Sequence, residues 1–433
     1  MVHKMIGVLT CVFVSLVAAG TAWADGAVYA MTNALGNNQI NVYHRAGNGT
    51  LTLMQTIATG GGGSGLQLDG TDSLGSQGSL VLDKKHHRLL AVNTESLAEH
   101  TVGGSMVGDC QQGTISSFRV APDGSLLLVD RVLSGGLFPD SLAVDGNLLY
   151  VLNAGGPGLN PVCSTSPNIT GFKLRPGGEI SLLTNATQPI NPGSSPGTFL
   201  NCDPGGFPAG YFDCGMNPPA FPRSPGQIGF TPDDKQLVVT VKATNTIYVF
   251  PIERGGIPGT PTVTQAQGPN QPTYFGFAFD REGHLIVSEP FGASPTIPAS
   301  PASTVSSFAI TRSGDLEVIS ASIPNGQGTS CWVVLEPQRE RYAYIADNAT
   351  SDISSYTVGD DGSLTLLAGS AAVANRPNDM AVAREGNSDF LYVLGSGDGT
   401  VDAFQINGDG SLTSLGVAGG LPIGHGAQGL AAY

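Results

Sequence analysis

The stretch GTVDAFQINGDGSLTSLGV, residues 399–417, reads as a short strand, a turn that contains glycine, and a second strand. In both strands apolar and polar residues tend to alternate along the chain, which is the period-2 pattern of a sheet with one face buried more deeply. The turn contains Asp409 and Gly410, and glycine accepts the positive φ that tight hairpins require. The stretch therefore predicts an antiparallel hairpin.

The first strand of this hairpin recurs six times earlier in the chain. The matching segments are NQINVYHR from Asn38, GTISSFRV from Gly113, NITGFKL from Asn168, NTIYVFPI from Asn245, STVSSFAI from Ser303 and SDISSYTV from Ser351. Their aligned aromatic residues, together with Phe404, are Tyr43, Phe118, Phe172, Phe250, Phe308 and Tyr356, separated by 75, 54, 78, 58, 48 and 48 residues. A repeat near 48 residues, lengthened by insertions, predicts an all-β fold, a seven-bladed β-propeller with four-stranded blades.

The two ends of the chain predict how the ring closes. Residues 27–33, AVYAMTN, match second strands such as FLYVLGS, and residues 426–433, GAQGLAAY, match first strands such as PDSLAVD. We expect residues 425–433 to pair beside residues 27–33 as the innermost strand of the first blade. Closing the ring in this way removes exposed strand edges.

The start of the chain has the features of an export signal. Lys4 precedes an apolar run, and Ala22-Trp23-Ala24 is an A-x-A cleavage site, so residues 1–24 are interpreted as a signal peptide and residues 25–433 as one propeller domain. The apolar run is too short for a typical membrane span. We expect a secreted or periplasmic protein, where disulfides persist.

Five cysteines follow the expected cleavage site. Cys202 and Cys214 bracket a loop rich in Gly and Pro and are the expected disulfide pair. Cys110 and Cys163 precede the recurring strand in consecutive repeats and could pair across neighbouring blades. Cys331 begins an apolar run and is expected to pack as a free thiol.

Charge and composition restrict the partners. The formal net charge is −15, with 19 Lys and Arg against 34 Asp and Glu. Such a chain lacks the basic surface that binds nucleic acid or an anionic membrane, and we expect neither partner. We expect the protein to be a monomer.

Long insertions are predicted to gather on one face of the propeller. They fall between blades, at residues 60–76 and 189–224, or between second and third strands, at residues 94–112, 154–167 and 290–302. In a propeller these two classes of loop emerge on the same face, and long loops on a rigid rim mark a candidate binding face. The alternative is that the insertions are tolerated without a role.

Polar side chains at the starts of first strands and the ends of second strands are the candidate site residues. His425 and Glu289 are the candidate acid and base, because His titrates near neutrality and other blades carry mostly amides or small residues in place of Glu289. The candidate ligand-binding residues are Lys242 and Arg376, which could hold a carboxylate, and Asn378, Asp347, Asn93 and Asp140. Such a ring could also hold a divalent cation such as calcium. The alternative for each Asn or Asp is that it ends its strand and bonds loop backbone.

The repeats resemble the seven-bladed lactonase propellers, the family that contains 6-phosphogluconolactonase-like proteins and 3-carboxymuconate cyclases. The similar segments are LLAVNTES at 89–96, GTISSFRVAPDGSLLLV at 113–129, LYVLNAGG at 149–156 and YAYIADNATSDISSYTVGDDGSLTLL at 342–367. The resemblance implies a lactone hydrolase or a muconate cycloisomerase acting at the loop-rich face, with a small organic acid or lactone as its partner.

Family enzymes often carry Pro-His or Arg-His where first strands begin. The corresponding positions here are Pro139-Asp140, Pro225-Gly226 and Pro377-Asn378, and only Gly424-His425 keeps an imidazole. No catalytic triad is therefore transferred from the family. The alternative function is a non-catalytic secreted propeller that binds a ligand or a protein partner through its rim loops.

Overall fold

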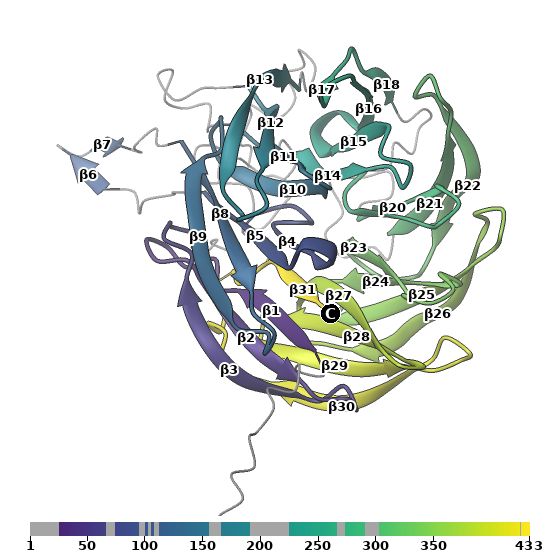
Figure 1. Ribbon diagram of the computed structural model, residues 1–433. Helices are drawn as coiled ribbons and strands as arrows, with labels where there is room; N and C mark the ends of the chain where they lie inside the picture. The colour runs from purple at the N-terminus through teal and green to yellow at the C-terminus, as the bar shows by residue number, and fades with distance from the viewer. Residues whose placement is uncertain are drawn as a thin grey trace, which may run out of the picture.

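The strands of the computed structural model are arranged as seven blades around a central axis (Figure 1). The structure describes residues 26–65, 74–94, 100–102, 105–107, 112–155, 166–190, 225–265, 273–290, 303–424 and 426–433. Within these residues each blade is an antiparallel sheet of four main strands, ordered from the channel outward as first to fourth. The prediction of a seven-bladed, all-β propeller is confirmed.

The strand bounds follow the repeats found in the sequence. Blade 1 holds β31 (Leu430–Ala432), β1 (Ala27–Met31), β2 (Gln39–Arg45) and β3 (Leu51–Ala58). Blade 2 holds β4 (Leu80–Asp83), β5 (Arg88–Asn93), β8 (Thr114–Val120) and β9 (Leu126–Leu133). Blade 3 holds β10 (Pro139–Asp145), β11 (Leu148–Asn153), β12 (Asn168–Leu174) and β13 (Ile180–Pro189). Blade 4 holds β14 (Pro225–Phe230), β15 (Gln236–Val241), β16 (Thr246–Glu253) and β18 (Thr262–Gln265), with the two-residue β17 (Ile257–Pro258) also paired to β16.

The remaining blades have the same order. Blade 5 holds β19 (Phe277–Phe279), β20 (Leu285–Glu289), β21 (Thr304–Ile310) and β22 (Leu316–Pro324). Blade 6 holds β23 (Ser330–Leu335), β24 (Tyr342–Asp347), β25 (Asp352–Val358) and β26 (Leu364–Val373). Blade 7 holds β27 (Pro377–Glu385), β28 (Ser388–Gly395), β29 (Thr400–Ile406) and β30 (Leu412–Ala418). Outside the blades lie the hairpin of β6 (His100–Val102) and β7 (Ser105–Val107), and the 3₁₀ turns η1 (Lys84–His86) and η3 (Lys242–Thr244).

The ring closes as the two ends of the chain predict. β31 pairs antiparallel with β1, in the register Val28 with Ala432 and Ala30 with Leu430. The buried Arg45 reinforces the closure, because its Nε donates to the carbonyl of Tyr433 at 2.9 Å. Blade 1 is therefore built from both ends of the chain, and the prediction of ring closure is confirmed.

Neighbouring blades pack face to face through apolar side chains. The seven aligned aromatic residues are all buried, and in six blades a register shift between the third and fourth strands lies next to the aromatic residue. Such a bulge increases the local twist, which each blade needs in order to follow its neighbour around the ring.

Tyrosine hydroxyls link four of the blades to the next one. Each tyrosine lies on a second strand and donates to the carbonyl of the glycine in the third-to-fourth-strand turn of the next blade. The pairs are Tyr29 with Gly124 at 2.9 Å, Tyr150 with Gly256, Tyr344 with Gly410 at 2.9 Å and Tyr392 with Gly49 at 3.0 Å. The recurring turn glycine thus also serves as a hydrogen-bond acceptor between blades.

Candidate functional site

The two faces of the propeller differ. We call the face where second strands end the loop face, and the face that carries the turns from first to second strands and from third to fourth strands the turn face. The residues proposed from the sequence lie at strand ends on the loop face. Several of the long insertions, and His425 itself, lie outside the described residues.

A short segment crosses the central channel on the loop-face side. Residues 74–78, here called the crossing segment, precede β4 and are hydrogen-bonded to other blades. The carboxamide of Gln77 donates to the carbonyl of Val333 at 2.8 Å and accepts from its N–H at 3.0 Å, and the Gln77 N–H donates to the carbonyl of Gly226 at 3.0 Å. Blade 2 is thus tied across the channel to blades 6 and 4.

Ser76 extends these contacts to two more blades. Its carbonyl accepts from Nε1 of Trp332 at 3.0 Å and from Nε2 of Gln428 at 2.6 Å, and its hydroxyl donates to the carbonyl of Asp140 at 2.6 Å. Because these partners belong to blades 6, 1 and 3, the crossing segment holds the inner strands in place and forms a floor beneath the loop face.

Lys242 lies beside this floor. Its ammonium donates to the carbonyls of Gly75 and Pro225, the latter at 3.2 Å, and lies 4.7 Å from the centroid of the Phe275 ring. The residue is only 2% exposed. A buried ammonium requires such partners, because removing a charge from water is costly when it is not compensated.

Three further polar residues at the starts of first strands satisfy backbone N–H groups of the next blade. Oγ of Ser141 accepts from Ile228 at 3.2 Å, Oε1 of Gln227 accepts from Phe277 at 2.6 Å, and Oδ2 of Asp379 accepts from Leu430 at 3.1 Å. Inner strands are sheet edges, and their buried N–H groups need acceptors. These side chains provide them.

Glu289 ends the second strand of blade 5 and is fully buried. Its carboxylate oxygens accept hydrogen bonds from the hydroxyls of Thr304 and of Ser306, the latter at 2.5 Å, both on the third strand of the same blade. Burial raises the pKa of this carboxyl, while the hydroxyl hydrogen bonds oppose the shift. Glu289 is thus held toward its own blade.

Asp347 occupies the corresponding position in blade 6. Its Oδ1 accepts from Ser330 and from Nδ2 of Asn325 at 3.0 Å, and its Oδ2 accepts from the N–H of Ser354 at 2.9 Å. Burial raises the pKa of Asp347 to about 7, against these hydrogen bonds.

Asn93 is the counterpart in blade 2 and is also fully buried. Its Nδ2 donates to Ser116 at 2.9 Å, and its Oδ1 accepts from Thr59 at 2.6 Å and from Asn38 at 3.2 Å. The ends of three second strands therefore carry similar polar networks, with an amide in blade 2 and carboxyl groups in blades 5 and 6.

The remaining candidates are dispersed. Asp140 is buried next to the crossing segment, and the Asn378 side chain accepts from Nδ2 of Asn348 at 2.6 Å. Arg376 is exposed on the loop face, with φ of 49°. Of the proposed site residues, the structure thus brings Lys242 and Asp140 together around the crossing segment, and it holds Glu289, Asp347 and Asn93 in separate blades.

His425 lies between two residues that the structure does describe. Gly424 donates to the carbonyl of Ser396 at 3.0 Å, and the carbonyl of Gly426 accepts from Asn33 at 3.2 Å. Both anchors lie at the ends of second strands, in blades 7 and 1.

The cysteines proposed to pair, Cys110, Cys163, Cys202 and Cys214, also lie outside the described residues. Cys331 is a buried thiol that packs in one apolar cluster with Phe275 and Trp332.

The crossing segment could not be predicted from the sequence. Trp332 and Gln428 read as core or strand residues, and no local pattern shows that both reach Ser76, 256 and 352 residues away in sequence. Gln77 stands out only as a polar residue before an apolar strand.

No group of three or more His, Cys, Asp or Glu side chains suited to a metal ion occurs among the residues that the structure describes. In the same part of the chain, no helix is both long enough and apolar enough to cross a bilayer. The calcium expected from the sequence thus remains a prediction.

Solved structures of other proteins are similar to this chain in fold. No family model matches the chain, and no curated protein matches it in sequence. Among solved structures, a Bacteroides uniformis protein provisionally named a 6-phosphogluconolactonase shares 14% identity over 94% of this chain and 100% of that one, with a TM-score of 0.65. The periplasmic gluconolactonase of Pseudomonas aeruginosa shares 16% identity over 94% and 98%, with a TM-score of 0.62. The chain is therefore similar in fold to lactonase-like propellers along nearly its whole length.

Proposed function

We propose that this protein is an exported propeller of the lactonase family that hydrolyses a lactone, or cyclises an unsaturated acid, at the loop face. The similarity of fold to a periplasmic gluconolactonase and the sequence resemblance both support this reaction class. The crossing segment gives this proposal its main support from the structure, because residues tied across the channel would close the base of a site at the loop-face mouth.

The proposed roles follow from the chemistry of the side chains. His425 and Glu289 are proposed as acid and base, and Lys242 and Arg376 as cations near a substrate carboxylate. Asn378, Asp347, Asn93 and Asp140 are proposed to orient the ligand directly or through the strand ends that they stabilise. A divalent cation such as calcium would polarise the lactone carbonyl.

Export and processing are part of the same proposal. Residues 1–24 would be removed as a signal peptide, and residues 25–433 would be a secreted or periplasmic monomer with the Cys202–Cys214 disulfide and a second bridge between Cys110 and Cys163. N-terminal sequencing of the exported protein and non-reducing peptide mapping test these points. A protein that starts at Met1, or an alkylatable Cys202, would contradict them.

The test of function is turnover of a panel of aldonolactones and muconates by the purified mature protein, with and without calcium. His425→Gln and Glu289→Gln should abolish turnover, whereas the control variants His44→Gln and Glu317→Gln, which lie elsewhere, should retain it. Melting temperatures of all four variants show whether a loss of turnover reflects chemistry or unfolding.

A second candidate function is a binding module without catalysis. It is favoured by one observation: the oxygens of Glu289 and Asp347 are engaged by donors of their own blades, and the Lys242 ammonium is engaged by two carbonyls. In this case the panel would show no turnover, and a sugar acid or lactone would bind and raise the melting temperature.

A further inference from the structure

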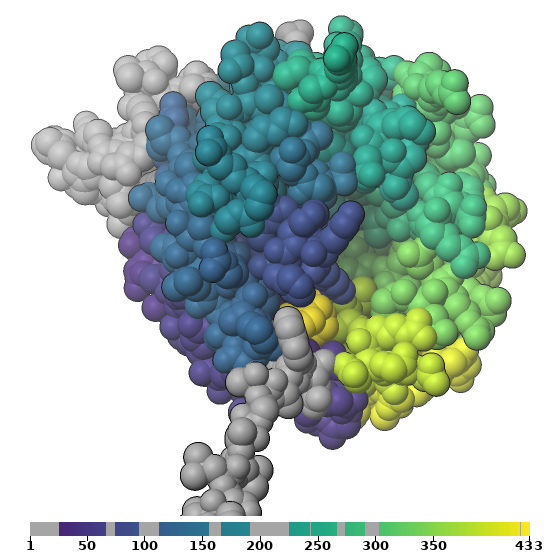
Figure 2. Space-filling view, in the orientation of Figure 1, coloured from purple at the N-terminus to yellow at the C-terminus, as the bar shows by residue number. Residues whose placement is uncertain are grey.

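The channel beneath the crossing segment is a cavity that opens on the turn face. Its volume is about 410 Å³, and it is lined at the inner end by Gln77, Gly78 and Asp379 and toward the mouth by Val144 and Asp234. Figure 2 shows this face of the molecule hollowed at its centre. Much of the wall between the two ends is aliphatic or aromatic, and includes Val81, Leu142, Ile228, Phe230, Phe279 and Met380.

A groove continues from the mouth of this cavity. It has a volume of about 560 Å³ and runs between blades 4 and 5, and both hollows are lined by Thr231 and Pro232. The groove has an apolar part formed by Pro251, Ile252 and Ile310. Cavity and groove therefore form one continuous depression on the face opposite the proposed lactonase site.

The groove carries one cation more than it has carboxylates. Asp233 pairs with Lys235 at 2.8 Å, and Glu282 pairs with Arg281 at 3.2 Å. Arg312 also lines the groove and is exposed, and no ion pair to it is found among the described residues. In a protein with a net charge of −15, the groove therefore has a local excess of one positive charge, which favours an anionic ligand.

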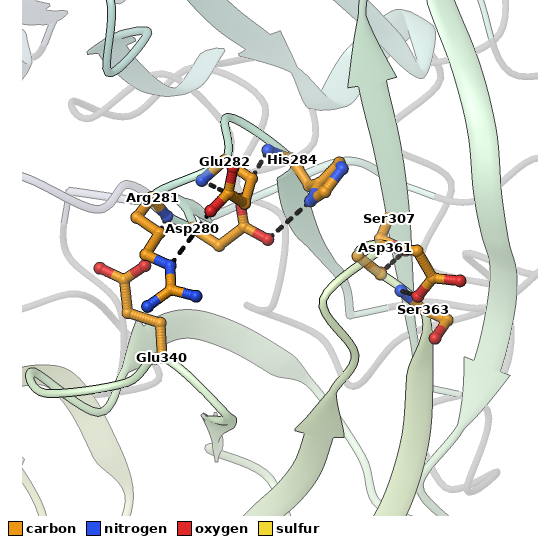
Figure 3. A network of polar contacts seen from close by, with 9 residues as sticks. Asp280, Arg281, Glu282, His284, Ser307, Glu340, Asp361 and Ser363 are labelled. Carbon is orange, nitrogen blue, oxygen red and sulfur yellow. Dashed lines mark hydrogen bonds and ion pairs between the residues drawn. The ribbon is translucent and has the colours of Figure 1, made fainter.

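The groove wall is held in place by a polar network (Figure 3). Oδ1 of Asp280 accepts from the N–H groups of Glu282 at 3.1 Å and His284 at 2.8 Å, and its Oδ2 lies 2.7 Å from Nδ1 of His284. The N–H of Arg281 donates to Glu340 of the next blade. The turn that carries Arg281 and Glu282 is thus fixed before any ligand arrives, which lowers the entropic cost of binding.

The charges also orient a ligand. The charged groups that line the cavity are the carboxyls of Asp234 and Asp379, so an anionic group is disfavoured there. Both oxygens of Asp379 already accept backbone hydrogen bonds, from Met380 at 2.8 Å and Leu430 at 3.1 Å. An apolar chain suits the cavity, and an anionic end suits the groove near Arg312.

We propose that this depression binds an amphiphilic carboxylate, with its apolar chain in the channel and its carboxylate at Arg312. The site is separate from the proposed lactonase site, because the crossing segment lies between the two. Binding of a ligand in this depression therefore does not depend on the proposed catalysis at the loop face.

Calorimetric titration of the mature protein with decanoate, below its micelle concentration, tests the proposal. Decanoate should bind, and each methylene removed in the series to hexanoate should weaken binding about fourfold, as expected for buried CH₂ groups. Arg312→Gln should weaken decanoate binding about tenfold or more, because it removes a charge-assisted hydrogen bond. The matched control Arg339→Gln, an exposed arginine of blade 6 outside the groove, should leave it unchanged.

Two further measurements test the apolar cavity and the preference for a negative charge separately. Val144→Phe, at a partly exposed position of the cavity wall, should weaken the binding of decanoate and leave the binding of acetate unchanged. The melting temperature of the variant checks that it is folded. Decyltrimethylammonium, which has the same chain and the opposite charge, should bind at least about tenfold more weakly than decanoate. Equal binding of the two amphiphiles, equal effects of Arg312→Gln and Arg339→Gln, or no binding of decanoate at millimolar concentration would overturn the proposal.

Discussion

Replacing Asp347 with Asn should remove a large part of the pH dependence of stability. The Asp347 carboxyl is fully buried, and burial raises its pKa from the ordinary 3.8 to about 7. Its unfolded counterpart ionises near the ordinary value. Between these two pKa values the folded state holds a proton that the unfolded state has lost.

The sign and size follow from this difference. A raised carboxyl pKa contributes stability that is fully present below the unfolded pKa and is lost as the pH rises through the folded pKa. Each pKa unit is worth about 1.36 kcal/mol, so the shift corresponds to about 4 kcal/mol, lost between about pH 4 and pH 8. Asn has no proton to lose, so the variant should not show this decline.

The substitution is one that the fold already accommodates. Asn93 occupies the corresponding strand end in blade 2, where its Nδ2 donates to Ser116 and its Oδ1 accepts from Thr59. Asn at position 347 can likewise accept from Asn325 and Ser330 through its carbonyl oxygen. It leaves the N–H of Ser354 facing an NH₂ group, which costs about 1–3 kcal/mol at every pH.

Urea unfolding between pH 4 and pH 8, followed by the fluorescence of Trp332, measures the effect. The measured quantity is the unfolding free energy of the variant minus that of the wild type. This difference should become more positive by about 4 kcal/mol between pH 4 and pH 8, because only the wild type loses stability over this range. Glu289 is common to both proteins, so its contribution cancels. Asp360→Asn, at an exposed position, is the control. Parallel pH profiles for wild type and Asp347→Asn would refute the reasoning.

Three other outcomes are expected. Tyr392→Phe removes the hydroxyl that bonds Gly49 of the next blade and should cost about 1–3 kcal/mol, because a buried carbonyl loses its donor; an unchanged urea midpoint would contradict this. Gln77→Ala removes both side-chain bonds to Val333 and should make Trp332, now fully buried, accessible to acrylamide, whereas retained protection would show that the crossing segment is held without Gln77. Deleting residues 426–433 removes β31 and exposes the edge of β1, so the truncated chain should aggregate or unfold well below the wild-type melting temperature; an unchanged melting temperature would show that ring closure adds no stability.

The blades were predictable because their signals are local. A strand with an aromatic residue near its end, followed within a few residues by a glycine turn, reports on backbone conformation and burial at that place in the chain. Seven repeats and two complementary ends then leave a closed ring as the simplest arrangement. Phe404 and Gly410 could be assigned to a blade without knowledge of any distant contact.

The candidate site was less predictable, because the strand-end residues look alike in sequence. Asn93, Glu289 and Asp347 read equally well as ligands of a small molecule or as partners of their own blades. The structure shows them hydrogen-bonded to hydroxyls and amides of their own blade or of the blade before it. These partners appear in the sequence only as unremarkable Ser, Thr and Asn residues.

The amino-acid sequence by itself determined the number of blades, their strand order and the closure of the ring, because alternation, turn glycines and aromatic spacing act within a few residues. Only the tertiary structure decided that residues 74–78 cross the channel, that Lys242 stabilises this crossing, and that the described cavity opens on the turn face. Those features depend on hydrogen bonds between residues such as Gln77 and Val333, 256 positions apart, and such contacts exist only once the ring has brought distant inner strands to one axis.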